Sequence, residues 1–375
     1  MKIIALTRTT PLGPSTRYRI DQYRPLLAEH GMDVQMRPLF GPTWFRILEQ
    51  PAGPLRTLAK SAYSLARLAA RVVQICTLRA ARPDLVLIEQ QLFPYLPASL
   101  ETFLWPRRFP TALEFDDAIY LTSGHRAKLE RLCARAHVVI VGNNFLADFA
   151  RQHAQTVRVI PTTVDLARYK QAQIIQRARR AEGDTTLRVG WIGLRYNFPF
   201  LETLARPLAQ LAAAGTKVEL RVISSGAPES SPRWGDVRIV HRPWSQESEA
   251  AELGACDISV MPLPDTDWAR GKCGLKVLQS MAAAVPVICS PVGVNEEIVN
   301  NGSNGLLADG DQSWHEALAK LAQNLDYRIQ LGESGLRTVE TSYNLIDGAD
   351  KVMEAYGLAS LRAEEGGNSA GNHRR

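Results

Sequence analysis

The chain has 375 residues, of which 45% are hydrophobic, and a formal net charge of +6 at neutral pH. This length provides cores for two ordinary domains, and the mild positive charge favours anionic partners such as nucleotides, phosphorylated sugars or an acidic membrane surface. The charge does not indicate nucleic-acid binding, because no RNA- or DNA-binding motif accompanies it.

The first half of the sequence alternates short apolar runs with helical patterns. The run KIIAL is followed by a loop that contains Gly13, and a helix is expected over residues 17–30, ending at Gly31. No GxGxxG motif follows the first run, so the dinucleotide-binding fingerprint is absent. The alternation indicates a parallel α/β sheet. Its strands are expected at residues 2–6, 34–38, 84–88, 111–115, 138–141 and 157–160.

Residues 44–83 differ in composition, with seven basic residues and a single acid, Glu49. Between residues 58 and 76, apolar side chains recur at alternating steps of four and three, and the basic residues of 56–71 fall on the opposite face. This spacing predicts a basic amphipathic helix. It either covers the sheet with its apolar face and leaves the basic face in solvent, or contacts an anionic membrane surface through residues 56–71.

The second half repeats the alternation after a polar connector at residues 170–186. Its strands are expected at residues 187–192, 218–223, 237–241, 257–261, 285–289 and 305–308. Helices are expected at residues 199–214, 275–284, 313–324, 327–343 and 345–361. The polar, glycine-rich stretch 362–375 is expected to be disordered. Two Rossmann-like halves place ligands at the carboxyl ends of their strands.

The stretch WARGKCGLKVLQSMAAAVPVICSPVGVNEEIV, residues 268–299, contains the strongest candidate site. Gly271, Lys272 and Gly274 precede a helix, and a second turn contains Gly293. Glycines, lysines and a helix N-terminus together suit a phosphate-bearing ligand. Lys272 and Lys276 are four residues apart, so both are expected on one helix face. Their structural alternative is a pair of solvated lysines at the start of a helix.

We find no sequence feature that indicates secretion or insertion into a membrane. The five cysteines are scattered without paired spacing, which is typical of reduced thiols. We see no signal peptide and no run of about 18 uncharged apolar residues. We expect the protein to be cytoplasmic. Peripheral attachment to the inner face of the cell membrane is a second possibility.

Several segments resemble one family. VIPTTVDLARY (159–169), RVGWIGLRYNFPFLETL (188–204) and the stretch from Gly271 to Val299 are similar to the interdomain, donor-loop and donor-core segments of family-4 retaining glycosyltransferases, also termed glycosyltransferase group 1. LEFDDAIY (113–120) and PSTRYRI (14–20) resemble segments of a bacterial subgroup.

The resemblance implies the GT-B fold, in which two Rossmann-like parallel-sheet domains face an interdomain cleft. It places an acceptor domain at residues 1–165 and a nucleotide-sugar donor domain at residues 166–344. The helix at 345–361 would pack back on the first domain, and residues 362–375 form the disordered tail.

The family also suggests roles for the donor-site residues. Lys272, Lys276 and Arg195 would stabilise the donor diphosphate as the glycosidic bond breaks. Many members carry two glutamates at E-x7-E, but these positions are Gly271 and Gln279 here. Gln279 remains able to hydrogen-bond to a ribose as a neutral group. The remaining donor-binding candidates are Gly193, Gly274, Gly293, Glu296 and Glu297.

Acceptor-side candidates come from the first half. Asp116 and Asp117 end a strand and would bind a hydroxyl group or accept its proton, with helix capping as the alternative for Asp117. Gly13 would allow close approach of a ligand, and Arg17 would bind an acceptor phosphate. No residue set has metal-ligand spacing, so we expect no metal and no cofactor beyond the nucleotide sugar.

The sequence therefore predicts a retaining hexosyltransferase that uses a nucleoside-diphosphate sugar and acts on a hydroxyl group of a saccharide or lipid-linked glycan in cell-surface polysaccharide or glycolipid synthesis. Two alternatives stay open. One is a non-catalytic GT-B homologue that serves as a binding or partner subunit, which the missing glutamates favour. The other is a nucleotide-sugar epimerase, against which the scarcity of carboxylates in the site motifs argues.

Overall fold

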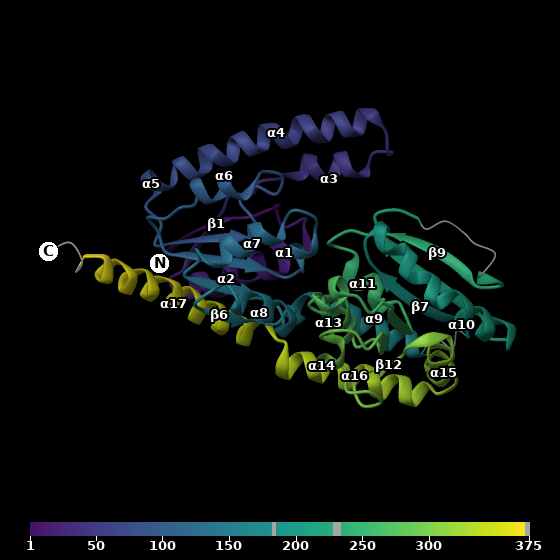
Figure 1. Cartoon of the computed structure of the whole chain (residues 1–375). Coiled ribbons are helices and arrows are strands. Elements are labelled where there is room, and N and C mark those ends of the chain that lie inside the picture. The colour runs from purple at the N-terminus through teal and green to yellow at the C-terminus, as the bar shows by residue number, and fades with distance from the viewer. Residues whose placement is uncertain (182–184, 228–233, 372–375) are drawn as a thin grey trace. The chain divides into compact units, whose positions relative to one another are not determined.

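The computed structural model describes residues 1–181, 185–227 and 234–371, and the chain divides into two compact units (Figure 1). The first unit contains Met1–Thr162, the short segment Gly271–Cys273 and the chain from Ile346 onward. The second contains Thr163–Arg270 and Gly274–Leu345. The sequence-based boundary, between residues 165 and 166, lies close to the change of unit after Thr162.

The first unit is built on a six-stranded sheet in the order β2-β1-β3-β4-β5-β6, with every neighbouring pair parallel. β3 and β4 are buried along their whole length, as expected of strands covered on both faces. All six strands of the sequence analysis are present: β1 (Lys2–Leu6), β2 (Asp33–Met36), β3 (Leu85–Glu89), β4 (Thr111–Phe115), β5 (Val138–Val141) and β6 (Val157–Val159).

The helix expected over residues 17–30 is divided in the structure. α1 (Pro14–Arg19) and α2 (Arg24–Glu29) are separated by the 3-10 turn η1 (Asp21–Tyr23). Pro25 explains the break, because proline lacks the N–H that a continuous helix would need at this point. The other helices of this region are α3 (Pro42–Glu49), α4 (Pro54–Cys76), α5 (Leu78–Ala81), α6 (Ala98–Phe103), η2 (Ile119–Leu121), α7 (Arg126–Cys133) and α8 (Asn144–Arg151).

The orientation of α4 differs from the first sequence-based alternative, in which its apolar face covers the sheet and its basic face lies in solvent. Leu58 and Leu65 are 67% and 72% exposed, whereas Arg71 is fully buried. Arg71 donates to the backbone carbonyls of Arg37 and Thr7, and Arg67 donates to those of Pro38 and Leu39. These carbonyls follow β1 and β2 and need donors, so Arg67 and Arg71 turn inward beside the buried Leu68, whereas Leu58 and Leu65 turn outward.

The C-terminal helix α17 (Leu345–Gly371) belongs to the first unit from Ile346. Its buried side chains include Val352 and Tyr356, and Glu354 lies 3.6 Å from Arg158, which is in β6. We expected residues 362–375 to be disordered, but the helix continues to Gly371. Residues 372–375 lie outside the described part of the chain.

The second unit contains a sheet in the order β12-β11-β10-β7-β8-β9, again wholly parallel. Counted from β7, this is the 3-2-1-4-5-6 order of dinucleotide-binding folds. The six expected strands are present here too: β7 (Leu187–Ile192), β8 (Val218–Ser224), β9 (Arg238–Pro243), β10 (Ile258–Met261), β11 (Val287–Cys289) and β12 (Leu306–Leu307). The predicted fold class, two Rossmann-like parallel sheets, is thus confirmed.

Helices of the second unit follow the expected pattern with shifted ends. The connector forms α9 (Lys170–Ala181), and its residues 182–184 are outside the described part. The helix expected at 199–214 begins as the 3-10 segment η4 (Arg195–Leu201) and continues as α10 (Glu202–Ala213). The rest are η3 (Leu166–Tyr169), α11 (Glu249–Gly254), α12 (Asp267–Arg270), α13 (Leu275–Ala282), α14 (Asn295–Ile298), α15 (Gly310–Gln323) and α16 (Leu325–Ser342).

None of the helices in the described part is both long enough and apolar enough to cross a membrane.

Candidate functional site

The carboxyl ends of the strands carry the candidate site residues in both units. In the first sheet, β1 lies between β2 and β3, so the chain connections leave in opposite directions at the β1/β3 boundary. Such a switch point is where open α/β sheets bind ligands. In the second sheet the corresponding boundary lies between β7 and β10.

Glu89 is the centre of the polar cluster at the β1/β3 boundary. Its carboxylate accepts hydrogen bonds from the backbone N–H of Arg8 at 2.8 Å and from the hydroxyl of Thr16 at 2.8 and 2.9 Å. Burial raises the pKa of Glu89 to about 7, although these two donors act in the opposite direction. The sequence analysis missed Glu89, and an acid at the end of an apolar strand was the available signal.

Gln90 follows Glu89 in the left-handed backbone region, with a φ of 61°. Its side chain accepts a hydrogen bond from the Arg8 guanidinium at 2.5 Å. Non-glycine residues rarely adopt this conformation, and such residues gather at functional sites. The cluster therefore joins local strain with a buried carboxylate of raised pKa.

Asp116 follows β4, next to a buried ion pair. Arg19 donates through Nε to Glu114 at 2.6 Å and through a second nitrogen to the Ile160 carbonyl at 2.8 Å. Burial raises the pKa of Glu114, and the nearby charges of Asp116 and Glu89 act in the same direction. The Oδ1 atom of Asp116 is buried and receives no hydrogen bond from the described residues, so it is an unsatisfied acceptor.

The segment Gly271–Cys273 packs within the first unit, although the helices on either side of it belong to the second. Asn143 donates to the Lys272 carbonyl at 3.0 Å, and the Cys273 thiol donates to the Asp116 carbonyl at 3.1 Å. Burial raises the pKa of Cys273 well above its usual value, so it is a neutral thiol. Lys272 Nζ lies 4.0 Å from Asp117 Oδ1, so these two predicted site residues are brought together.

Gly271 needs to be a glycine because a Cβ atom there would lie 2.6 Å from the Cβ atom of Ala118. The two acceptor candidates, Gly13 and Arg17, are both buried. A Cβ atom at Gly13 would collide with Thr9, so this glycine allows the loop to fold on itself. Arg17 donates to the Pro11 carbonyl at 3.2 Å. Both contacts are structural, and the phosphate-binding role of Arg17 remains a prediction.

Lys276 and Gly193 meet at the β7 end of the second sheet. The Lys276 ammonium lies 5.0 Å from the centre of the Trp191 ring, in cation–π range. A Cβ atom on Gly193 would lie 2.8 Å from this ammonium and 2.4 Å from the ring. Gly193 is therefore required for Lys276 to occupy its position after β7, where the resemblance places the donor.

The predicted alignment of Lys272 and Lys276 on one helix face is wrong. α13 begins at Leu275, and its cap residue is Gly274 with a φ of 67°. Lys272 lies before this cap in the first unit, and Lys276 lies in the first turn of α13 in the second. The left-handed glycine ends the loop and prevents the helix from extending back to Lys272. The cap residue Gly274 has no side chain that could accept a hydrogen bond from the first turn of α13.

Gln279 is buried rather than open to a ligand. Its amide donates to the Glu249 carboxylate at 2.8 Å, and the same carboxylate accepts a hydrogen bond from the Trp244 indole at 2.8 Å. A carboxylate thus lies beside the position where the family motif has its second glutamate, but it comes from α11. The sequence analysis missed Glu249, because no local pattern links it to Gln279.

The remaining donor candidates lie on loops and short helices. Gly293 has a φ of 58°, and a Cβ atom there would lie 2.8 Å from the Arg270 carbonyl oxygen, so two loops cross closely. Glu296 and Glu297 are exposed in α14, and the charge of Glu297 contributes to raising the pKa of Tyr343 after burial, the larger cause. Arg195 is exposed at the start of η4.

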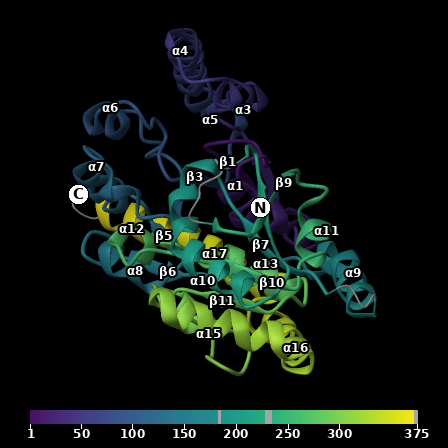
Figure 2. The ribbon, with the colours of Figure 1, turned by 90° about the vertical axis from the view of Figure 1, so that its right-hand side faces the viewer.

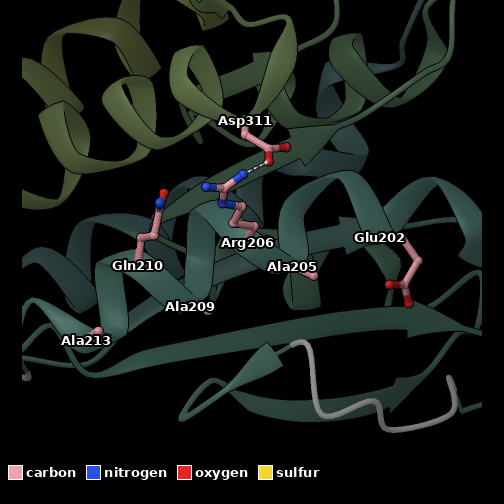
Figure 3. Close-up of a pocket in the computed structure, with 7 residues that line it drawn as sticks. All are labelled: Glu202, Ala205, Arg206, Ala209, Gln210, Ala213 and Asp311. Carbon is pink, nitrogen blue, oxygen red and sulfur yellow. Dashed lines mark hydrogen bonds and ion pairs between the residues drawn. The ribbon is translucent and has the colours of Figure 1, made fainter.

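A hollow of about 620 Å³ on the second unit contains none of these residues. It runs along the outer side of α10 and is bridged by Arg206 and Asp311, 3.3 Å apart (Figure 3). Its other walls are mainly alanines. Both bridging side chains are well exposed, and the hollow extends along the helix rather than over the carboxyl ends of the strands. We therefore place the candidate site at the strand ends. The described residues include no group of three or more metal-ligating side chains.

Comparisons with known proteins fit this geometry. Residues 187–324 match the family described as Glycosyl transferases group 1. A D-inositol 3-phosphate glycosyltransferase from Corynebacterium urealyticum is 26% identical over 66% of this chain and 64% of its own length. One from Corynebacterium jeikeium is 28% identical over 47% of this chain and 46% of its own. The chain thus spans less than two thirds of the length of these relatives.

Solved structures extend the likeness to nearly the whole chain. A sucrose-phosphate synthase from Thermosynechococcus elongatus has a TM-score of 0.68 at 18% identity, covering 95% of this chain and 98% of its own. HepE from Anabaena, in complex with UDP and glucose, has a TM-score of 0.65 at 17% identity, covering 94% and 98%. At such identities the likeness shows the fold. The chain has the GT-B fold, and its residues 187–324 match the model of the group 1 glycosyl transferase family.

Proposed function

We propose that this chain transfers a hexose from a nucleoside-diphosphate sugar to a hydroxyl group of a saccharide or lipid-linked glycan, with retention of configuration. The observation that carries the proposal is the placement of Lys276 beside Gly193 at the carboxyl end of β7. An ammonium group, a glycine loop and a helix N-terminus without a side-chain cap together form a site for a diphosphate.

In this proposal Lys276 and the first turn of α13 stabilise the charge that develops on the leaving diphosphate. Arg195 in η4 and Lys272 would add further positive charge, and Glu296, Glu297 and the turn at Gly293 would contact the sugar. The acceptor hydroxyl attacks from the face on which the diphosphate leaves. A diphosphate oxygen takes the hydroxyl proton, so the step needs no separate protein base, and we propose no metal or other cofactor.

The acceptor would bind at the first unit. Asp116 offers an oxygen that no described residue satisfies, and Asp117 lies beside Lys272. Asp116 would accept a hydrogen bond from the acceptor hydroxyl and orient it for attack. Arg17 would serve an anionic acceptor if ligand binding displaced its contact with Pro11.

UDP-glucose is the first donor to test, because HepE from Anabaena was solved with UDP-glucose. A donor that binds the folded state stabilises it by mass action, by about 2.7 kcal/mol at a hundredfold excess over Kd. Thermal unfolding should therefore shift upward with UDP-glucose, or with a GDP-hexose if the base preference differs, and not with free glucose. No shift with any nucleotide sugar would refute donor binding.

A non-catalytic homologue would bind the same donor without turning it over. Steady release of the nucleoside diphosphate from the sugar donor, with and without simple saccharides or inositol phosphate, separates the two functions. An epimerase would instead convert one nucleotide sugar to another without releasing the nucleotide. The products identify the class directly.

We also propose that the chain works at the inner face of the cell membrane, where a lipid-linked glycan would be presented. The amphipathic segment 56–71 supports this location, although Arg67 and Arg71 bind backbone carbonyls instead of projecting outward.

A further inference from the structure

The outward face of α4 is apolar along most of the helix. Leu55, Leu58, Leu65 and Val73 are 83%, 67%, 72% and 61% exposed, and three alanines between them (Ala62, Ala66 and Ala69) are exposed as well. An amphipathic helix normally buries its apolar stripe. We define these four residues as the α4 stripe. Large exposed apolar patches mark interaction sites.

The helix lies at the outer edge of the first unit, with α3 beside it (Figures 1 and 2). Some of its inward contacts are apolar, since Leu68 lies in the core and Val72 packs against it. Others are hydrogen bonds: the Gly41 N–H donates to the Tyr63 hydroxyl oxygen at 3.0 Å, and Arg67 and Arg71 donate to backbone carbonyls. These contacts fix the rotation of the helix. The stripe cannot turn inward without leaving these carbonyls without donors.

The charge around the stripe is positive. Residues 42–82 contain seven bases and one acid. With Arg67 and Arg71 turned inward, the exposed cations of this segment are Arg46, Lys60, Arg79 and Arg82. An apolar stripe without acids, in a segment whose exposed charges are mainly positive, matches the interface of an anionic bilayer.

We propose that the α4 stripe inserts into the interfacial layer of an anionic membrane, with α4 parallel to the surface. From Leu55 to Val73 the helix is about 27 Å long at 1.5 Å per residue, which suits a helix lying in the interface. A second copy of the chain fits less well, because stripe-to-stripe packing would bring two positively charged segments together. The inference rests on the proposed function at the inner face of the cell membrane. It assigns the membrane contact to the apolar side chains of the α4 stripe rather than to Arg67 and Arg71, which turn inward.

Flotation of the full chain with vesicles of phosphatidylglycerol and phosphatidylcholine tests the proposal without any donor. The double variant Leu58→Ser with Leu65→Ser removes the centre of the stripe. The matched control, Ile174→Ser with Leu325→Ser, removes two exposed aliphatic side chains from α9 and α16. A third variant, Arg46→Gln with Lys60→Gln and Arg79→Gln, removes three of the four exposed cations of this segment. Circular dichroism and thermal unfolding check that each variant folds.

The wild-type chain and the control should float with anionic vesicles. The stripe variant should bind roughly tenfold or more weakly, because it removes two large apolar side chains from the interface. The charge variant should bind anionic vesicles more weakly and neutral vesicles as well as the wild type does.

Flotation of the stripe variant at wild-type levels would overturn the proposal. The proposal would also be overturned if the wild-type chain formed a dimer without vesicles and the stripe variant were a monomer, since the stripe would then be a protein interface. Donor binding by these proteins is measured separately, so loss of transferase function and loss of membrane contact remain distinguishable.

Discussion

Glu89 is buried at the switch point of the first sheet. It accepts hydrogen bonds from Arg8 and Thr16, and the next residue, Gln90, has a left-handed backbone conformation. The Glu89 pKa of about 7 lies above the ordinary value of 4.5, so between these values the folded chain holds a proton that the unfolded chain has lost. The associated stability is fully present below about pH 4.5 and is lost as the pH rises through 7.

Replacement of Glu89 by glutamine should therefore flatten the pH dependence of stability. Glutamine keeps an acceptor oxygen for Thr16 and for the Arg8 N–H and cannot ionise. The free energy of unfolding of the wild type should fall between pH 5 and pH 7 by up to about 3 kcal/mol more than that of Glu89→Gln. Denaturant unfolding at the two pH values measures this difference. Parallel pH profiles of the two proteins would show that Glu89 does not titrate in this range.

Gly193 is the residue on which the position of Lys276 depends. The substitution Gly193→Ala places a methyl group 2.8 Å from the Lys276 ammonium and 2.4 Å from the Trp191 ring. We expect donor affinity to fall about tenfold or more and stability to fall by about 1–3 kcal/mol through overpacking. Calorimetric titration with UDP-glucose and denaturant unfolding measure the two effects.

Gly226 offers a matched control in the same unit. A Cβ atom there has open space around it, so Gly226→Ala should leave donor affinity unchanged. Equal donor affinities for Gly193→Ala and the wild type would remove Lys276 from the donor site.

Local sequence patterns predict some of the site residues and miss others. A lysine near a helix N-terminus points to an anion, and Lys276 lies at such a place. The contact between Lys276 and Gly193 joins residues that are far apart in sequence, and it depends on the packing of α13 against the end of β7. The Gln279–Glu249 hydrogen bond likewise joins α13 to α11. No local pattern contains either pair.

At the level of elements, strands were predictable and the orientation of α4 was not. Most of the twelve strands in the described part of the chain are short apolar runs between turn residues, which a local pattern can identify. The periodicity of α4 defines two faces but does not say which face has partners. The partners of Arg67 and Arg71 are carbonyls of residues 7 and 37–39, which reach α4 only through the tertiary fold.

Arg71 therefore holds α4 in its orientation, and its loss should be costly. Arg71→Met keeps much of the side-chain volume but leaves the Thr7 and Arg37 carbonyls without their donor. We expect the free energy of unfolding to fall by about 3 kcal/mol. Arg79→Met, at an exposed position one helix later, should change it by less than about 0.5 kcal/mol. If denaturant unfolding gives similar values for the two variants, the inward contacts of Arg71 contribute little.

The whole molecule combines two parallel sheets that are each ordered around their own switch point. Both orders, 2-1-3-4-5-6 and 3-2-1-4-5-6, gather polar residues at the carboxyl strand ends. The chain exchanges segments between its units: Gly271–Cys273 and the chain from Ile346 onward both pack in the first unit. This division could not be read from the motif GKCGLK, which is continuous in sequence and split in space.

The split assigns different tasks to the two lysines of that motif. Lys276 lies in the second unit with the proposed donor site, and Lys272 lies in the first unit beside Asp117. We expect Lys276→Ala to weaken donor binding strongly, whereas Lys272→Ala should leave donor affinity within a few-fold of the wild type and lower the turnover number. Calorimetric titration with UDP-glucose combined with initial rates separates these effects. Equal losses of donor affinity in both variants would contradict this division.

Release of the nucleoside diphosphate from a nucleotide sugar by the purified chain is the most direct test of the central claim, that this chain is a glycosyltransferase with its donor diphosphate at Lys276. The account predicts steady release of UDP from UDP-glucose, or of GDP from a GDP-hexose, that increases with a suitable acceptor and falls by roughly a hundredfold or more in Lys276→Ala, in line with the loss of one charge-stabilising group. A chain that binds nucleotide sugars without releasing the diphosphate, or one whose Lys276→Ala variant releases it at the wild-type rate, would contradict the claim.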